Sequence, residues 1–164
     1  MAKKCEGGNA KYEFGEETYW CTGAGEGTLE SSSFGSCVGL VLFDPQRNIG
    51  MVAHYSGSLG KEKYQQKVRD DTHEILETVC PNRTGNWNGW LFGGTSLESK
   101  SASSGSLAGL DLGTSTVEQT KNLMKTVREQ LQTEKMPVTW KSEGYPSYKA
   151  VKLDLSTGTP DFKK

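Results

Sequence analysis

The most constraining feature of the sequence is a pair of short apolar runs joined by a turn. The runs cover residues 38–43 and 49–53, and both are too short for a core helix and rich in strand-forming residues. The Asp-Pro-Gln-Arg-Asn segment between them, residues 44–48, has the composition of a turn. Two antiparallel strands joined by a tight turn bring their outer ends together. The pattern therefore predicts a β-hairpin of two apolar strands.

A cysteine and a histidine stand at the outer ends of this hairpin. Cys37 opens the first strand and His54 closes the second. An imidazole beside a thiol can take its proton, which makes the cysteine a nucleophile. The alternative is a buried structural cysteine and an unrelated histidine. Because the hairpin places the two side chains at neighbouring positions, we favour a Cys–His site.

The segments around the hairpin form a longer motif. Phe34-Gly35-Ser36-Cys37-Val38 is followed by Asp44-Pro45, by Ile49-Gly50 and by His54. This order resembles the signature of the CheD family, the chemoreceptor glutamine deamidases, with its Leu-Gly-Ser-Cys-Val segment, Asp-Pro turn and active-site histidine. Weaker similarity continues through the Gly-Gly segment at residues 91–97 to about residue 158.

The resemblance assigns a role to each matching residue. It implies that Cys37 is the nucleophile and His54 the base. It implies that Ser31, at the position of a family threonine, is the third catalytic residue and orients His54. The implied active loop, whose backbone amides would hold an oxyanion, consists of Gly35, Ser36 and Cys37. The residues expected to form the substrate rim are Tyr55, Ser56, Gly93 and Gly94.

The activity that the resemblance implies is protein-glutamine deamidation, which converts glutamine to glutamate and ammonia through a thioester on the cysteine. No metal or organic cofactor is expected. The expected partners are a protein substrate bearing a reactive glutamine and a regulatory protein, in a bacterial chemotaxis setting. The chain departs from the family pattern after His54, at residues 55–60, and at Ser115-Thr116.

These departures leave three alternatives to a chemoreceptor deamidase. The first is a catalytically inactive CheD-like binding module. The second is another cysteine hydrolase, since the same dyad serves any acyl transfer. The third is an effector-type deamidase that acts on a protein outside chemotaxis.

Composition bounds the remaining function classes. The net charge of −1, from 19 basic and 20 acidic side chains, gives no electrostatic reason to expect nucleic acid or an anionic membrane as a partner. The chain has no signal-peptide pattern and no apolar stretch of transmembrane length. The four cysteines lack metal-ligand spacing, so we expect free thiols in the cytoplasm, with a Cys21–Cys80 disulfide as the alternative.

The 164 residues suit one domain. Residues 1–10 are polar and rich in glycine, so we expect them to be disordered, and residues 11–164 to form the deamidase-like domain. Helical patterns at 61–79 and at about 117–135, with Ser115 and Glu118 as a capping box, alternate with about seven strands. This order predicts an α+β fold with a mixed sheet and two long helices. The resemblance further implies α/β/α layers.

Overall fold

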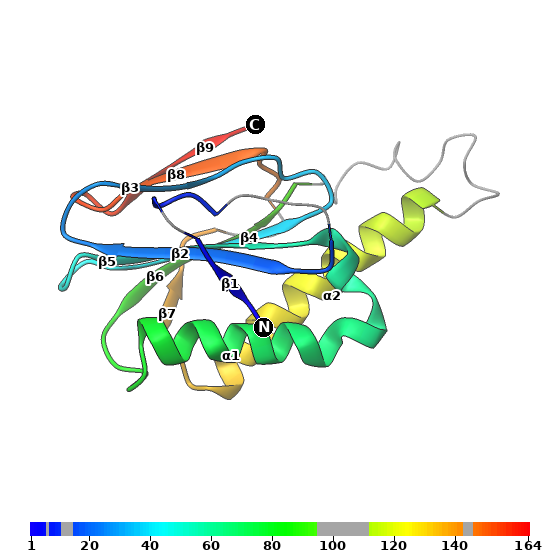
Figure 1. The fold of residues 1–164 in the computed structure, drawn as a ribbon, viewed down its shortest axis with the longest axis horizontal. Coiled ribbons are helices and arrows are strands. Elements are labelled where there is room, and N and C mark those ends of the chain that lie inside the picture. The colour runs from blue at the N-terminus through cyan, green and yellow to red at the C-terminus, as the bar shows by residue number, and fades with distance from the viewer. Residues whose placement is uncertain (6, 11–14, 95–111, 143–145) are drawn as a thin grey trace.

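The structure is a computed structural model that describes residues 1–5, 7–10, 15–94, 112–142 and 146–164. It has three layers, with two helices below a central sheet and a smaller sheet above it (Figure 1). The predicted α+β class with a mixed sheet and two long helices is confirmed.

The central layer is a six-stranded mixed sheet in the order β1-β2-β5-β4-β6-β7. β1 pairs parallel with β2 and β6 pairs parallel with β7, whereas the other neighbours are antiparallel. The predicted hairpin forms the centre of this sheet as β4 and β5. The strands are β1 (Lys3–Lys4), β2 (Thr18–Ala24), β4 (Val38–Asp44), β5 (Ile49–Tyr55), β6 (Trp87–Gly93) and β7 (Val138–Trp140).

Both helices pack on one face of the central sheet (Figure 1). Alternate residues of β4 and β5 point toward this face, as a two-residue period requires. They join apolar side chains from both helices in one buried cluster. The helices are α1 (Gln65–Val79) and α2 (Leu112–Thr133), and two short 3₁₀ segments precede α1, namely η1 (Gly57–Gly60) and η2 (Glu62–Tyr64).

The other face of the central sheet is covered by a three-stranded antiparallel sheet in the order β3-β8-β9. The remaining alternate residues of β4 and β5 form a second apolar cluster with this small sheet. The layers are therefore α/β/β, which corrects the α/β/α order that the resemblance implied. The strands of the small sheet are β3 (Thr28–Ser31), β8 (Ala150–Asp154) and β9 (Thr159–Lys163).

The N-terminal residues differ from the expected disorder over residues 1–5 and 7–10. The β1 strand pairs with β2, while Asn9 forms a parallel bridge with Glu30 of β3. Ala10 is fully buried. This segment therefore contacts an edge of each sheet, and pairing of its backbone compensates for its lack of large apolar side chains.

Among the residues that the structure describes, no helix has both the length and the apolar composition needed to span a membrane.

Candidate active site

The hairpin places Cys37 and His54 on the same face of the central sheet. Gly39 of β4 pairs with His54 of β5, and Cys37 precedes Gly39 by two residues, so both side chains point toward the small sheet. Such diagonal positions lie about 7–8 Å apart at the backbone, and less between side chains. Cys37 is 3 % exposed and His54 is fully buried. The structure therefore brings these two predicted residues together in the layer between the sheets.

Ser31 contacts His54 from the opposing sheet. It is the last residue of β3, it is buried, and its Oγ lies 2.8 Å from His54 Nδ1. The same hydroxyl donates a hydrogen bond of 2.5 Å to the Ala10 carbonyl. Since a carbonyl cannot donate and the hydroxyl has one proton, Ser31 must accept its other bond from His54 Nδ1–H. Neutral His54 is therefore the Nδ1–H tautomer, and its Nε2 carries the lone pair.

An aromatic ring fixes the plane of the His54 imidazole. The Phe34 ring stacks on it, with 4.0 Å between centroids and 12° between planes. Phe34 in turn packs edge-on against Phe92. Burial lowers the pKa of His54 to about 4, because the charged imidazolium loses its hydration. At neutral pH the imidazole is therefore uncharged and able to accept a proton.

The thiol of Cys37 is also neutral in the resting site. Burial raises its pKa above the ordinary value, and a hydrogen bond from the Gly57 backbone opposes this shift. A raised thiol pKa together with a lowered imidazole pKa disfavours a resting thiolate–imidazolium pair. If the Cys37 thiol attacked an electrophile, it would have to lose its proton during the attack, and uncharged His54 is the candidate acceptor.

The predicted active loop lies at the surface, above the buried pair. Ser36 and Gly35 are exposed, whereas Phe34 and Cys37 are buried beneath them. The Gly35 amide donates to the Ser33 carbonyl at 3.0 Å, so it is not directed at a substrate oxyanion. Of the three amides expected to hold an oxyanion, those of Ser36 and Cys37 are the remaining candidates.

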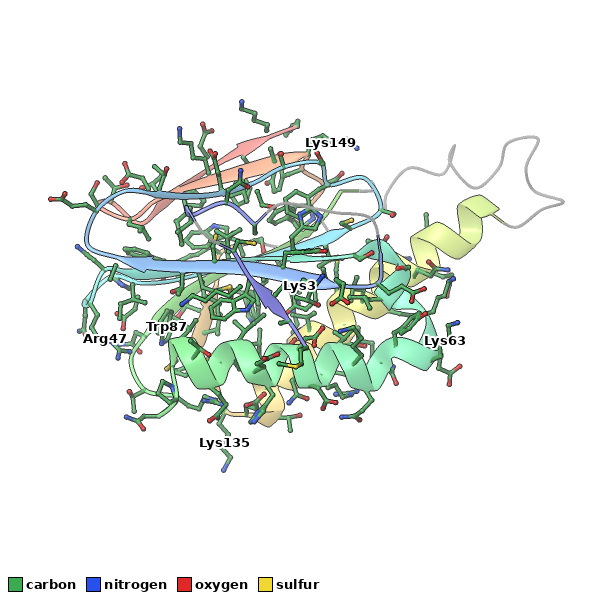
Figure 2. The ribbon with its side chains drawn as sticks, in the orientation of Figure 1. Lys3, Arg47, Lys63, Trp87, Lys135 and Lys149 are labelled. Atoms are coloured by element: carbon green, nitrogen blue, oxygen red, sulfur yellow. The ribbon has the colours of Figure 1, made fainter. Side chains whose placement is uncertain are left out.

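Gly94 closes the other side of this loop. Its amide donates to the Cys37 carbonyl at 2.9 Å, and a Cβ at this position would collide with the Phe34 and Gly35 carbonyls. The Nζ of Lys149, labelled beside the small sheet in Figure 2, donates to the Gly94 carbonyl at 3.0 Å. Gly94 therefore contacts the predicted active loop directly, and only a residue without a side chain fits at this position.

The other expected rim residues are placed differently. Tyr55 follows His54 directly, so it points to the opposite face, where its hydroxyl lies 2.8 Å from the Thr72 hydroxyl, and it does not line the site. Gly93 lies within β6, paired with Val38. Ser56 is buried next to Gly57, which packs against Ser36.

Three contributors to the site were not assigned a role from the sequence. The Ala10 carbonyl accepts the proton of the Ser31 hydroxyl, and the Phe34 ring orients His54 by stacking. The Gly57 backbone forms a hydrogen bond to the Cys37 sulfur. Phe34 lies inside the motif, and its aromatic character was a usable signal. The other two contributions come from backbone groups, which every residue type carries, so the sequence could not reveal them.

A separate cluster groups three potential metal ligands, with ligand atoms within 4.8 Å of one another: His73, Glu77 and Glu134. The Arg83 guanidinium bonds both Glu77, at 2.7 Å, and Glu134. His73 Nδ1 lies 2.7 Å from the Glu134 carboxylate. Because the Arg83 guanidinium already pairs with both carboxylates, we assign this cluster to ion pairing that joins α1 to the residue following α2.

No protein-family model matches the chain, and no curated protein sequence matches it significantly.

Proposed function

We propose that the chain is a protein-glutamine deamidase in which Cys37 is the nucleophile, His54 the general base and Ser31 the residue that positions His54. The proposal rests above all on the 2.8 Å contact between Ser31 Oγ and His54 Nδ1. These residues come from different sheets, and the resemblance to the CheD family assigns them to one catalytic site. Acyl transfer by a catalytic triad uses a nucleophile, a base that takes its proton and a third residue that orients the base.

The protonation states of the site define the first chemical step. As the Cys37 sulfur attacks the carboxamide carbon of a glutamine, its proton moves to His54 Nε2. The tetrahedral oxyanion accepts hydrogen bonds from the Ser36 and Cys37 amides, and each such donor is typically worth about 3 kcal/mol. Ammonia leaves with the proton from His54, and a thioester remains on Cys37.

The second step restores the enzyme. His54 accepts a proton from water as the water attacks the thioester carbon, and the thiol leaves and takes the proton back. The net reaction consumes glutamine and water and yields glutamate and ammonia. Throughout, the Nδ1–H bond to Ser31 keeps Nε2 directed at the reacting atoms.

A glutamine side chain within a protein is the proposed substrate, and the resemblance to the CheD family is the reason for choosing it over free glutamine. The segment before the buried Cys37 offers four exposed residues for such a contact: Ser32, Ser33, Gly35 and Ser36. Chemoreceptors are the substrate class suggested by the resemblance, and the departures after His54 make other bacterial or host proteins the competing class.

The test incubates the purified chain with chemoreceptor cytoplasmic fragments and with an unrelated bacterial lysate, and follows amide-to-acid conversion by peptide mass spectrometry. We expect site-specific conversion that is lost in Cys37→Ala and falls about 10²–10⁴-fold in His54→Ala, as for removal of a general base. The matched control is Cys80→Ser, a buried thiol on the helical face of the sheet.

Three results would overturn the proposal. Equal conversion by wild type and Cys37→Ala would remove the thiol mechanism. Hydrolysis of methyl esters or peptides without any release of ammonia would identify another cysteine hydrolase. A chain that binds a protein partner but converts no substrate, with Cys37 inert to glutamine-like haloacetamides, would identify the inactive binding module.

A further inference from the structure

Of the cysteines outside the candidate active site, Cys21 lies within β2 and Cys5 directly after β1, the strand that pairs with β2. β1 pairs parallel with β2, with Lys3 opposite Tyr19 and Lys4 opposite Trp20. The Cys5 amide continues this ladder by donating to the Trp20 carbonyl at 2.7 Å. In a parallel ladder this bond belongs to the Lys4–Trp20 pair, and the next step of the same register brings Cys5 beside Cys21.

The two side chains point to the same side of the sheet. Cys5 packs against the apolar cluster that contains Cys21, between the central and the small sheet. Neighbouring strands are about 4.7–4.9 Å apart. This spacing lies within the Cα separation of about 4.4–6.8 Å that a disulfide spans. Both thiols are free in the structure.

The other cysteine pairing considered from the sequence does not fit this fold. Cys80 belongs to the cluster on the helical face, and Cys21 belongs to the cluster on the opposite face. The central sheet therefore separates their sulfur atoms, which excludes a Cys21–Cys80 disulfide in the folded chain.

We infer that Cys5 and Cys21 form a reversible disulfide when the chain meets a low-molecular-weight disulfide such as oxidised glutathione. This inference does not depend on the deamidase activity proposed above.

The accessibility of the two thiols sets the order of the reaction. Cys5 is partly exposed, whereas Cys21, Cys37 and Cys80 are buried. The Cys5 thiolate attacks one sulfur of oxidised glutathione, the S–S bond breaks, and one glutathione thiolate leaves with the electron pair. Cys21 then loses its proton and attacks the Cys5 sulfur, which releases the second glutathione. Two protein thiols are oxidised, one glutathione disulfide is reduced, and the two protons pass to the released thiolates.

The second step is the slow one. Burial is the main cause that raises the pKa of Cys21 to about 12, so little thiolate is present at neutral pH. We therefore expect a mixed disulfide on Cys5 to accumulate first and to resolve faster as the pH rises.

The disulfide would lock the segment that supports Ser31. Figure 1 shows β1 running from the helical layer toward the small sheet, and Figure 2 shows Lys3 on this strand. Only four residues separate Cys5 from Ala10, whose carbonyl accepts a hydrogen bond from the Ser31 hydroxyl. Further along, the Ala10 amide donates to the Glu30 carbonyl at 2.9 Å. A disulfide between Cys5 and Cys21 would therefore restrain the chain shortly before Ala10. The Ala10 carbonyl accepts the Ser31 proton, and this hydrogen bond determines the tautomer of His54.

The experiment equilibrates the reduced chain with oxidised glutathione and maps disulfides by peptide mass spectrometry. We expect a linked Cys5–Cys21 peptide that dithiothreitol removes, a thermal midpoint raised by roughly 5–10 °C, and hydrogen exchange at the Ala10 amide slowed roughly tenfold. In Cys21→Ala we expect the reaction to stop at glutathione bound to Cys5.

The matched control is the double variant Lys4→Cys with Cys5→Ser. Lys4 contacts the Trp20 ring on the other face of the strand pair, so its replacement carries a thiol that points away from Cys21. The inference is overturned if wild type keeps both thiols, if it stops at the mixed disulfide, or if the control links to Cys21 as readily as wild type. Deamidase assays enter none of these outcomes.

Discussion

At the scale of single residues, two hydrogen bonds to one hydroxyl decide which nitrogen of His54 can act as a base. Ser31 donates to Ala10 and so must accept from His54 Nδ1. The Phe34 ring prevents the imidazole from rotating out of this arrangement. The tautomer and the orientation of His54 are therefore set by one hydroxyl, one backbone carbonyl and one stacked ring.

This arrangement predicts the effect of removing the Ser31 hydroxyl. Ser31→Ala should lower the deamidation rate about 10- to 100-fold, as is typical when a supporting partner of a functional histidine is lost. It should also lower the free energy of unfolding by about 1–3 kcal/mol, because buried polar groups lose a partner. Nitrogen NMR shifts of His54 should change from a pure Nδ1–H tautomer to a mixture.

Two further variants control this prediction. Ser31→Thr keeps the hydroxyl and should retain the Nδ1–H tautomer. Ser32→Ala removes an exposed neighbouring hydroxyl and should leave the His54 spectrum unchanged. An unchanged tautomer in Ser31→Ala would mean that Ser31 does not set it.

At the scale of elements, the end of β6 determines where the active loop lies. The Gly94 amide holds the Cys37 carbonyl, and the loop carbonyls leave no room for a side chain at Gly94. Gly94→Ala should therefore push the loop away or shift β6, with a loss of about 1–3 kcal/mol in unfolding free energy, the usual effect of overpacking. Urea denaturation measures this loss.

Gly35→Ala is the matched control for that variant, because a Cβ at Gly35 meets no atom within 4 Å. It should change the urea midpoint little. If both alanine variants unfold at the wild-type midpoint, the close approach at Gly94 has no energetic consequence.

Most elements with strong patterns could be predicted from the sequence. The hairpin, β6 and β7 follow from apolar runs and turns. The helix predicted from residue 61 begins as α1 at Gln65, because residues 62–64 form a 3₁₀ turn. α2 begins at Leu112, so Ser115 lies inside the helix and is not its capping residue. The weak strands β1 and β9 were missed, because two lysines and a Thr-Pro-Asp-Phe-Lys segment carry almost no apolar pattern of their own.

The candidate site could be predicted in part, because one of its contacts depends on the strongly patterned hairpin. The hairpin alone brings Cys37 toward His54, because register follows from the turn. The contact of Ser31 with His54 crosses between two sheets, and only the family resemblance suggested it. Tyr55 was misplaced because one step along a strand reverses the side chain. The Ala10 contribution depends on backbone geometry and could not be inferred from residue type.

At the scale of the whole molecule, His54 lies in the layer that joins the two sheets, so its charge state affects the stability of the fold. Burial lowers its folded pKa to about 4, against about 6.5 in an unfolded chain. The unfolded chain therefore binds a proton more readily than the folded one between these values. The unfolding free energy must fall as the pH drops from about 6.5 toward 4, and it is unaffected by this group above that window.

We expect the chain to lose roughly 2 kcal/mol of unfolding free energy from this group between pH 7 and pH 5. Urea denaturation at the two pH values measures it. The chain has two histidines, and His73 is exposed, so His73→Gln should keep the loss and His54→Gln should abolish most of it. Because His54→Gln also disturbs the Ser31 contact, the comparison is made between the pH dependences of the variants and not between their stabilities. A pH dependence that survives in His54→Gln and disappears in His73→Gln would assign the proton uptake to the helical ion-pair cluster, and His54 would then not be a buried neutral base.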